Sequence, residues 1–106
     1  MAEIELNSRS DLEKVIRDGV TLVDFNAPWC GPCRAQEPIL LALDENYQGR
    51  ANIAKMNIDD NNEVALHMGI QSIPTLVVFK DGREINRLVG LQKAETLNRV
   101  LDKALA

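Results

Sequence analysis

Aromatic residues, histidine and cysteine are all scarce in this chain. It contains one Trp, one Tyr, two Phe, one His and two Cys. Two cysteines exclude a framework of several disulfides. A zinc ion normally takes four ligands, so two cysteines with His67 as the remaining nitrogen donor are a poor set for a zinc site. With so few aromatic residues available, we assign Phe25 and Phe79 to the hydrophobic core.

Long apolar runs and a basic excess are also missing. No window is apolar enough to span a membrane. The first ten residues alternate charged and apolar types, without the basic start and apolar stretch of a secretory signal, so we expect a cytoplasmic protein. The chain has 12 basic and 16 acidic residues, a net charge of −4, and its basic residues are scattered. Nucleic-acid binding requires clustered positive charge, so we expect no nucleic-acid and no membrane partner.

The length of 106 residues suits one compact domain with a working hydrophobic core. Hydrophobic residues make up 45% and charged residues 26% of the chain, which is ordinary for a soluble globular protein. We therefore expect residues 1–106 to form a single domain. In a reducing compartment, its two cysteines are more often catalytic or metal-binding than a permanent cross-link.

Strand-like and helix-like segments alternate along the chain. Short apolar or alternating runs predict strands at residues 3–6, 20–25, 52–58, 76–79 and 84–89. Helices are predicted after Ser10, over residues 33–48, through residues 63–66, and at the end of the chain, where Leu97, Val100, Leu101 and Ala104 should be buried. Asp81-Gly82 predicts a hairpin between the last two strands. This order predicts an α/β fold, a three-layer sandwich whose central mixed sheet carries helices on both faces.

Two local signals refine the predicted helices. Ser10 and Glu13 have the spacing of a capping box, in which the Ser10 hydroxyl accepts from the Glu13 amide. Pro38 lies inside the 33–48 helix and should kink it, because proline removes an amide donor and clashes with the preceding turn.

The stretch Trp29-Cys30-Gly31-Pro32-Cys33 contains both cysteines, at the point where a predicted strand leads into a helix. The exposed amides and positive dipole end of that helix favour the thiolate of Cys30, and the thiolate is the species that attacks disulfides. Cys33, one helical turn later, is placed to resolve the mixed disulfide. Gly31-Pro32 suits a tight turn into a helix, because an early helical position does not use the missing proline amide.

Three other interpretations of the cysteine pair are a structural disulfide, a metal site, and an iron-sulfur cluster shared between two chains. A structural disulfide across so small a ring would remove little entropy from the unfolded chain. A metal site lacks ligands, as described above. The spacing and its context favour redox chemistry.

Asp24 and Lys55 each have two interpretations. Asp24 either ends a strand with its carboxylate in water, or is buried behind the cysteines with a pKa raised by desolvation, and exchanges a proton with Cys33. Lys55 on the next strand either modulates Asp24 through its charge or is a solvated lysine at a sheet edge.

Ile73-Pro74 also has two interpretations. A proline before a strand commonly marks only where the strand begins. A cis bond would instead turn the backbone of residue 73 outward to pair with a substrate chain as an added strand. Spacing alone does not decide between them. We expect His67 to be a surface residue without a role and Asp59-Asp60 to be a solvated turn.

Several short motifs occur together in a characteristic order. They are Val23-Asp24-Phe25, Ala27-Pro28-Trp29-Cys30-Gly31-Pro32-Cys33, Lys55 with Asn57 and Asp59, Gly69-Ile70, Ile73-Pro74-Thr75, Phe79-Lys80-Asp81-Gly82 and Val89-Gly90. With this spacing the chain resembles the thioredoxin family over essentially its whole length. A lone pair of cysteines two residues apart would be far less specific.

The resemblance implies the thioredoxin fold and reduction of disulfides in client proteins, with Cys30 as attacking thiol and Cys33 as resolving thiol. It also implies a thioredoxin reductase as electron donor, a monomer, and no cofactor or metal. The Gly-Pro pair between the cysteines resembles the reducing members. A binding module with incidental cysteines is disfavoured because both cysteines are present, and a dedicated donor for one client is a narrower form of the same activity. The implied site residues are Asp24 for proton transfer, Pro74 as a cis-proline, Trp29, Ile73 and Gly90 on the substrate surface, and Gly31, Pro32 and Lys55 around the cysteines.

Two residues depart from the family pattern. Asn26 stands where the family usually has a second tryptophan, and Glu37, just before Pro38, stands where a small apolar residue is common. Neither residue takes part in the sulfur chemistry directly. We expect them to change stability, redox potential or partner choice.

We predict that Asn26→Trp changes at least one of three properties: the midpoint redox potential, Tm, and the rate of reaction with partner proteins. The physical reason is that a small amide leaves this corner looser and wetter than an indole ring would. Redox titration, thermal unfolding and stopped-flow kinetics measure the three properties. Unchanged values for all three would contradict the prediction.

Overall fold

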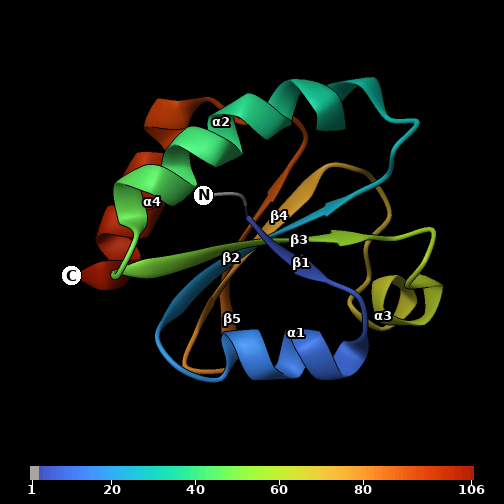
Figure 1. Cartoon of the computed structure of the whole chain (residues 1–106), viewed down its shortest axis with the longest axis horizontal. Coiled ribbons are helices and arrows are strands. Elements are labelled where there is room, and N and C mark those ends of the chain that lie inside the picture. Colours follow the sequence, from blue (N-terminus) through green and yellow to red (C-terminus); the bar gives the residue numbers. More distant parts are fainter. Residues whose placement is uncertain (1–2) are drawn as a thin grey trace.

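The structure is a computed structural model that describes residues 3–106. In this part of the chain, five strands and four helices follow one another in the predicted order (Figure 1). The strands are β1 (Ile4–Leu6), β2 (Val20–Asn26), β3 (Ala51–Asn57), β4 (Thr75–Lys80) and β5 (Arg83–Val89). The helices are α1 (Arg9–Ile16), α2 (Gly31–Tyr47), α3 (Asn62–His67) and α4 (Ala94–Leu105). No helix within residues 3–106 is long and apolar enough to cross a membrane.

The strands form one mixed sheet in the order β1-β3-β2-β4-β5. The pairs β1·β3 and β2·β3 are parallel, whereas β4 runs antiparallel to both β2 and β5. Helices α2 and α4 cover one face, and α1 and α3 cover the other (Figure 1). This arrangement confirms the predicted three-layer sandwich.

Strand β2 lies in the middle of the sheet and is buried from Val20 to Phe25. Side chains alternate between the two faces of a strand. Leu22 accordingly packs in the core beneath α2 and α4, while Phe25 packs in the core beneath α1 and α3, together with Phe79. Both phenylalanines are core residues, as predicted. The alternation also places Asp24 on the face covered by α2.

The hairpin predicted at Asp81-Gly82 joins β4 to β5. Both residues have positive φ, 50° for Asp81 and 87° for Gly82. Two-residue hairpin turns of this kind match the twist of the flanking strands, and aspartate and glycine tolerate the left-handed conformation best. The predicted strand ends agree with the structure to within one residue.

The predicted start of the first helix is wrong by two residues. Its N-cap is Ser8, whose Oγ accepts from the Asp11 amide at 3.0 Å. The Asp11 carboxylate in turn accepts from the Asn7 amide at 2.9 Å. Ser8 and Ser10 are both followed three residues later by an acidic residue, so the local pattern alone does not distinguish them.

Two further expectations for the helices need adjustment. Helix α2 begins at Gly31 rather than at residue 33, with Pro32 in its first turn, and it continues through Pro38. Val100 is only partly buried, unlike Leu97 and Leu101 on the same helix, because it lies beside an open hollow described below.

We predict that Ser8→Ala lowers the free energy of unfolding by about 1 kcal/mol, because it removes the side chain that caps α1. Ser10→Ala is the matched control, since Ser10 lies within the helix and is exposed, and it should change stability far less. Urea unfolding followed by circular dichroism measures both. Equal losses for the two variants would contradict the assignment of the cap.

Candidate active site

Cys30 and Cys33 form a disulfide at the start of α2. Cys30 is the N-cap residue of this helix, and its Sγ accepts from the Cys33 amide at 3.2 Å. Both side chains are almost fully buried. In the reduced protein, the same amide and the positive end of the helix dipole would stabilise a thiolate on Cys30. The structure therefore places Cys30 where the sequence predicted the nucleophile.

The segment Ile73-Pro74 lies directly against the cysteines. The Ile73–Pro74 peptide bond is cis, and the Ile73 carbonyl oxygen is 3.8 Å from Cys30 Sγ. On the other side, the Gly90 amide donates to the Pro74 carbonyl oxygen at 2.8 Å. Gly90 has a φ of 89°, a conformation that glycine adopts at little cost. The fold thus brings residues 73, 74 and 90 to the cysteine pair from distant parts of the sequence.

Trp29 is 65% exposed beside Cys30. Its indole Nε1 donates to Asp59 Oδ2 at 2.8 Å. Asp59 is exposed, as predicted for a solvated turn, but the contact with Trp29 was not predicted. This hydrogen bond gives the exposed ring a defined orientation next to the disulfide.

Gln36 is a buried polar residue that sequence reasoning missed. It is fully buried in α2, where its Nε2 donates to the Gln92 carbonyl oxygen at 3.1 Å and its Oε1 accepts from the Gln92 amide at 2.8 Å. The pair ties α2 to the segment that follows Gly90. Glutamine is an ordinary helix former, so nothing in the sequence marked this position.

Asp24 is fully buried, so the water-exposed interpretation is wrong. Its Oδ2 accepts from Asn26 Nδ2 at 3.1 Å, and no hydrogen-bond partner for Oδ1 lies within residues 3–106. Burial raises the pKa of Asp24 to about 7, and the negative charges of Glu3 and Glu37 add to the rise. The Asn26 hydrogen bond and the charge of Lys55 lower the pKa in part. Such a carboxyl exchanges protons near neutral pH.

Lys55 lies in β3, between β1 and β2, so the sheet-edge interpretation is wrong. It is the register partner of Asp24, but its Nζ is 3.0 Å from Glu37 Oε1 and 3.9 Å from Glu5 Oε1. Burial lowers the pKa of Lys55, but the hydrogen bond and charge of Glu37, with smaller contributions from other carboxylates, more than offset this and leave the pKa above its ordinary value.

Glu3 is a second buried carboxyl, and sequence reasoning missed it. It is 6% exposed, and neither carboxylate oxygen has a hydrogen-bond partner within the described chain. Burial, with the negative charge of Glu37, raises its pKa to about 7. The sequence pattern of residues 3–6 indicated only a short strand and gave no sign of a buried carboxyl.

A cleft of about 230 Å³ opens beside Cys33. Its lining includes Asn26, Cys33, Glu37 and Lys55. Asn26 is half-buried there. The cleft connects Cys33 and the two residues that depart from the family pattern to solvent.

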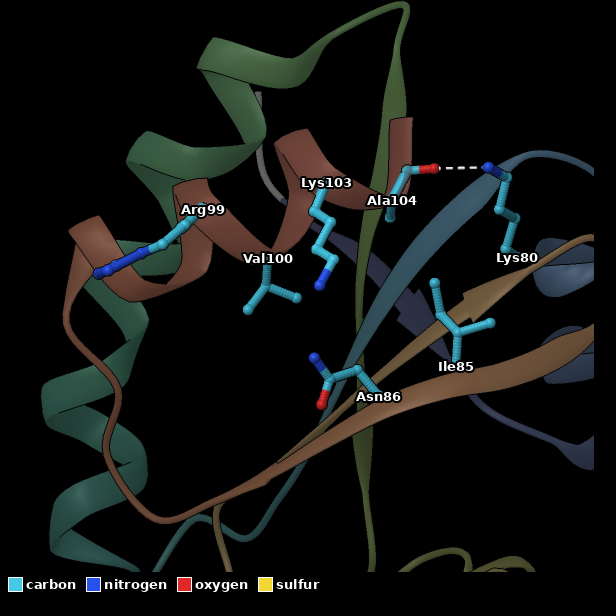
Figure 2. Close-up of a pocket in the computed structure, with 7 residues that line it drawn as sticks. All are labelled: Lys80, Ile85, Asn86, Arg99, Val100, Lys103 and Ala104. Carbon is cyan, nitrogen blue, oxygen red and sulfur yellow. Dashed lines mark hydrogen bonds between the residues drawn. The ribbon is translucent and has the colours of Figure 1, made fainter. Parts of the chain in front are cut away.

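A larger hollow of about 510 Å³ lies elsewhere, between β5 and α4. Figure 2 shows its walls, with Val100 on α4 facing Ile85 and Asn86 on β5. The remaining lining residues are Lys80, Arg99, Lys103 and Ala104. None of the predicted site residues is among them, so this hollow is separate from the cysteine site.

Comparison with known proteins gives one consistent family. The family model described as thioredoxin matches residues 3–103. A thioredoxin of Staphylococcus aureus is 46% identical over 96 residues, which cover 91% of this chain and 92% of that protein. Among solved structures, a mutant thioredoxin from Halobacterium salinarum NRC-1 superposes with a TM-score of 0.93 at 33% identity, over 99% of this chain and 92% of that one. The thioredoxin of Malassezia sympodialis superposes with a TM-score of 0.87 at 26% identity, over 100% of this chain and 94% of that one.

We predict that Asp24→Asn stabilises the protein more at pH 8 than at pH 4. The folded-state pKa of about 7 lies above the ordinary value of 3.8, so between these values the folded protein binds a proton that the unfolded chain has released. Raising the pH through this window therefore lowers the free energy of unfolding, by as much as about 4 kcal/mol. The amide variant lacks this loss. Urea unfolding of both oxidised proteins at pH 4 and pH 8 measures their free energies of unfolding. The prediction is contradicted if the difference between the two proteins is the same at both pH values.

Proposed function

The chain belongs to the thioredoxin family and is a thiol-disulfide oxidoreductase, and from this premise we propose the role of each residue in its reaction. The protein is a redox carrier whose reversible Cys30–Cys33 pair reduces disulfides in client proteins. The observation that supports the roles best is the disulfide at the start of α2, with Cys30 as N-cap and the cis Ile73–Pro74 bond beside it.

In the first step, the Cys30 thiolate attacks one sulfur of the client disulfide. A bond forms between Cys30 and that sulfur, the client disulfide breaks, and its other sulfur leaves as a thiolate that takes up a proton. In the second step, the Cys33 thiolate attacks Cys30 Sγ. The Cys30–Cys33 disulfide forms and the first client sulfur is released, so that two electrons have passed from the dithiol to the client.

Asp24 assists the second step as a general base. The Cys33 thiol must lose a proton before it attacks, and a buried carboxyl with a pKa of about 7 accepts a proton near neutral pH. The transfer occurs directly or through one water molecule. Lys55 modulates Asp24 through its charge, which lowers the pKa of Asp24.

The client chain docks across the surface around Cys30. Trp29 is exposed on one side of the disulfide, and the backbone of Ile73 and Pro74 lies on another, with Gly90 next to Pro74. An extended client segment pairs with the backbone of residue 73 as an added strand. The exposed Gly31 and Pro32 leave the approach to the disulfide unobstructed by large side chains.

The oxidised pair is returned to the dithiol by a thioredoxin reductase, and the clients are proteins with accessible disulfides. Family membership supports these partners in general terms. The carrier acts as a monomeric single domain over residues 1–106 and works in the cytoplasm, where a reducing environment maintains a dithiol. Neither sulfur step requires a cofactor or a metal.

We predict that Cys30→Ser abolishes the dithiothreitol-driven reduction of insulin, because it removes the attacking thiolate. Cys33→Ser should instead accumulate a mixed disulfide between Cys30 and insulin, since the resolving thiol is missing. Turbidity measures the first result, and non-reducing gel electrophoresis with mass spectrometry measures the second. Full activity of Cys30→Ser, or a trapped complex through Cys33 in the unmodified protein, would overturn the assigned roles.

A further inference from the structure

The charged groups around Asp24 are paired in an unexpected way. Lys55 is the register partner of Asp24 on β3. Its ammonium group nevertheless donates to Glu37, at 3.0 Å. Within residues 3–106, no ion pair joins Lys55 to Asp24. The polar side chain that does contact the Asp24 carboxyl is Asn26, at 3.1 Å from Oδ2. A neutral amide thus stands where a cation would be expected.

We propose that Asn26 and Glu37 are positioning residues that together set the proton affinity of Asp24. Glu37 engages the Lys55 ammonium group, and the Asn26 amide holds Oδ2 and leaves Oδ1 available for the proton of Cys33. This deepens the proposed function and rests on the role that it gives to Asp24.

The two residues act on Asp24 in opposite directions. A donor to the ionised carboxylate favours the charged form, so the Asn26 amide lowers the pKa of Asp24. A neighbouring negative charge disfavours the charged form, so Glu37 raises it. Glu37 also forms an ion pair with Lys55, whose positive charge lowers the pKa of Asp24.

Within residues 3–106 of the oxidised protein, Asn26 is the side chain that donates a hydrogen bond to Asp24. Glu3, from the segment before β1, raises the pKa through its charge. On the other side, β4 presents the apolar Leu76 as register partner. Cys33 of α2 lines the same cleft as Asn26. The Asn26 amide is therefore the donor that favours the ionised form of Asp24 at Oδ2.

Asn26 also forms the boundary between Asp24 and water. It lines the cleft of about 230 Å³, whereas Asp24 is fully buried and is not part of the lining. The amide has a second anchor, because Nδ2 also lies 3.2 Å from the Asp24 carbonyl oxygen. This double contact orients the amide toward the carboxyl rather than toward the cleft.

The test is a pH titration of the Asp24 carboxyl carbon by ¹³C NMR, in reduced and oxidised protein. Asn26→Leu removes the donor at similar volume and should raise the pKa of Asp24 by about one pH unit. Glu37→Gln removes the negative charge and frees Lys55, and should lower it. Glu5→Gln is the matched control, because it changes the more distant carboxylate on Lys55, at 3.9 Å, and should leave the Asp24 titration in place.

The pKa of Asp24 is expected to rise in Asn26→Leu and to fall in Glu37→Gln, and these opposite changes distinguish the proposed role from a merely structural one. Loosening of the corner would admit water and lower the pKa of Asp24 in both variants. An unchanged or lowered pKa in Asn26→Leu, or an unchanged or raised pKa in Glu37→Gln, would overturn the proposal. Asn26→Ala serves as a second donor-free variant if Asn26→Leu does not fold, and should shift the titration in the same direction.

A kinetic measurement separates this proposal from the role of Asp24 itself. At pH 7, a rise of the pKa from about 7 to about 8 reduces the ionised fraction of Asp24 roughly fivefold, so the resolving step of Asn26→Leu should slow by that factor and recover toward pH 9. Shifted titrations with an unchanged resolving rate would overturn the base role of Asp24 and leave the action of Asn26 and Glu37 on its pKa supported.

Discussion

Burial of β2 on both faces is the constraint on which the rest of the structure depends. The strand sits in the middle of the sheet, so α2 and α4 must cover one side and α1 and α3 the other. Its carboxyl end runs directly into the loop that precedes α2, which places Cys30 at a helix N-terminus. The same burial takes Asp24 out of water and raises its pKa. The position of Cys30 at the start of α2 and the burial of Asp24 therefore both follow from the central place of β2 in the sheet.

The site combines an exposed part around Trp29 with a buried part that contains Asp24 and Glu3. The Cys33 amide donates to Cys30 Sγ just below the surface, and the exposed Trp29 donates to Asp59. Asp24 and Glu3 are buried carboxyls that form no ion pair within the described chain. Buried carboxyls reduce stability at neutral pH, so the protein gives up part of its stability for a group that exchanges protons near pH 7.

Asn26 and Glu37 both line the cleft that opens beside Cys33. Asn26 contributes a small amide and an opening to solvent, and Glu37 contributes a charge that binds Lys55. Each residue alone looks like an ordinary polar substitution. In this protein Asn26 contacts the Asp24 carboxyl and Glu37 bonds to Lys55.

The sequence by itself determined the order of strands and helices, the cysteine pair at a helix start, and the family. The order of elements follows from local patterns such as apolar periodicity and the Asp81-Gly82 turn, and the family follows from the resemblance of the whole ordered set of motifs. The sequence did not determine which serine caps α1, because Ser8 and Ser10 share one local pattern.

Only the tertiary structure decided that Asp24 is buried, that Lys55 lies in an interior strand and bonds to Glu37, and that Gln36 and Glu3 are buried. The physical reason is that each of these depends on neighbours distant in the sequence. Burial and charge pairing are set by which strand lies beside which, and a local pattern carries no record of that order.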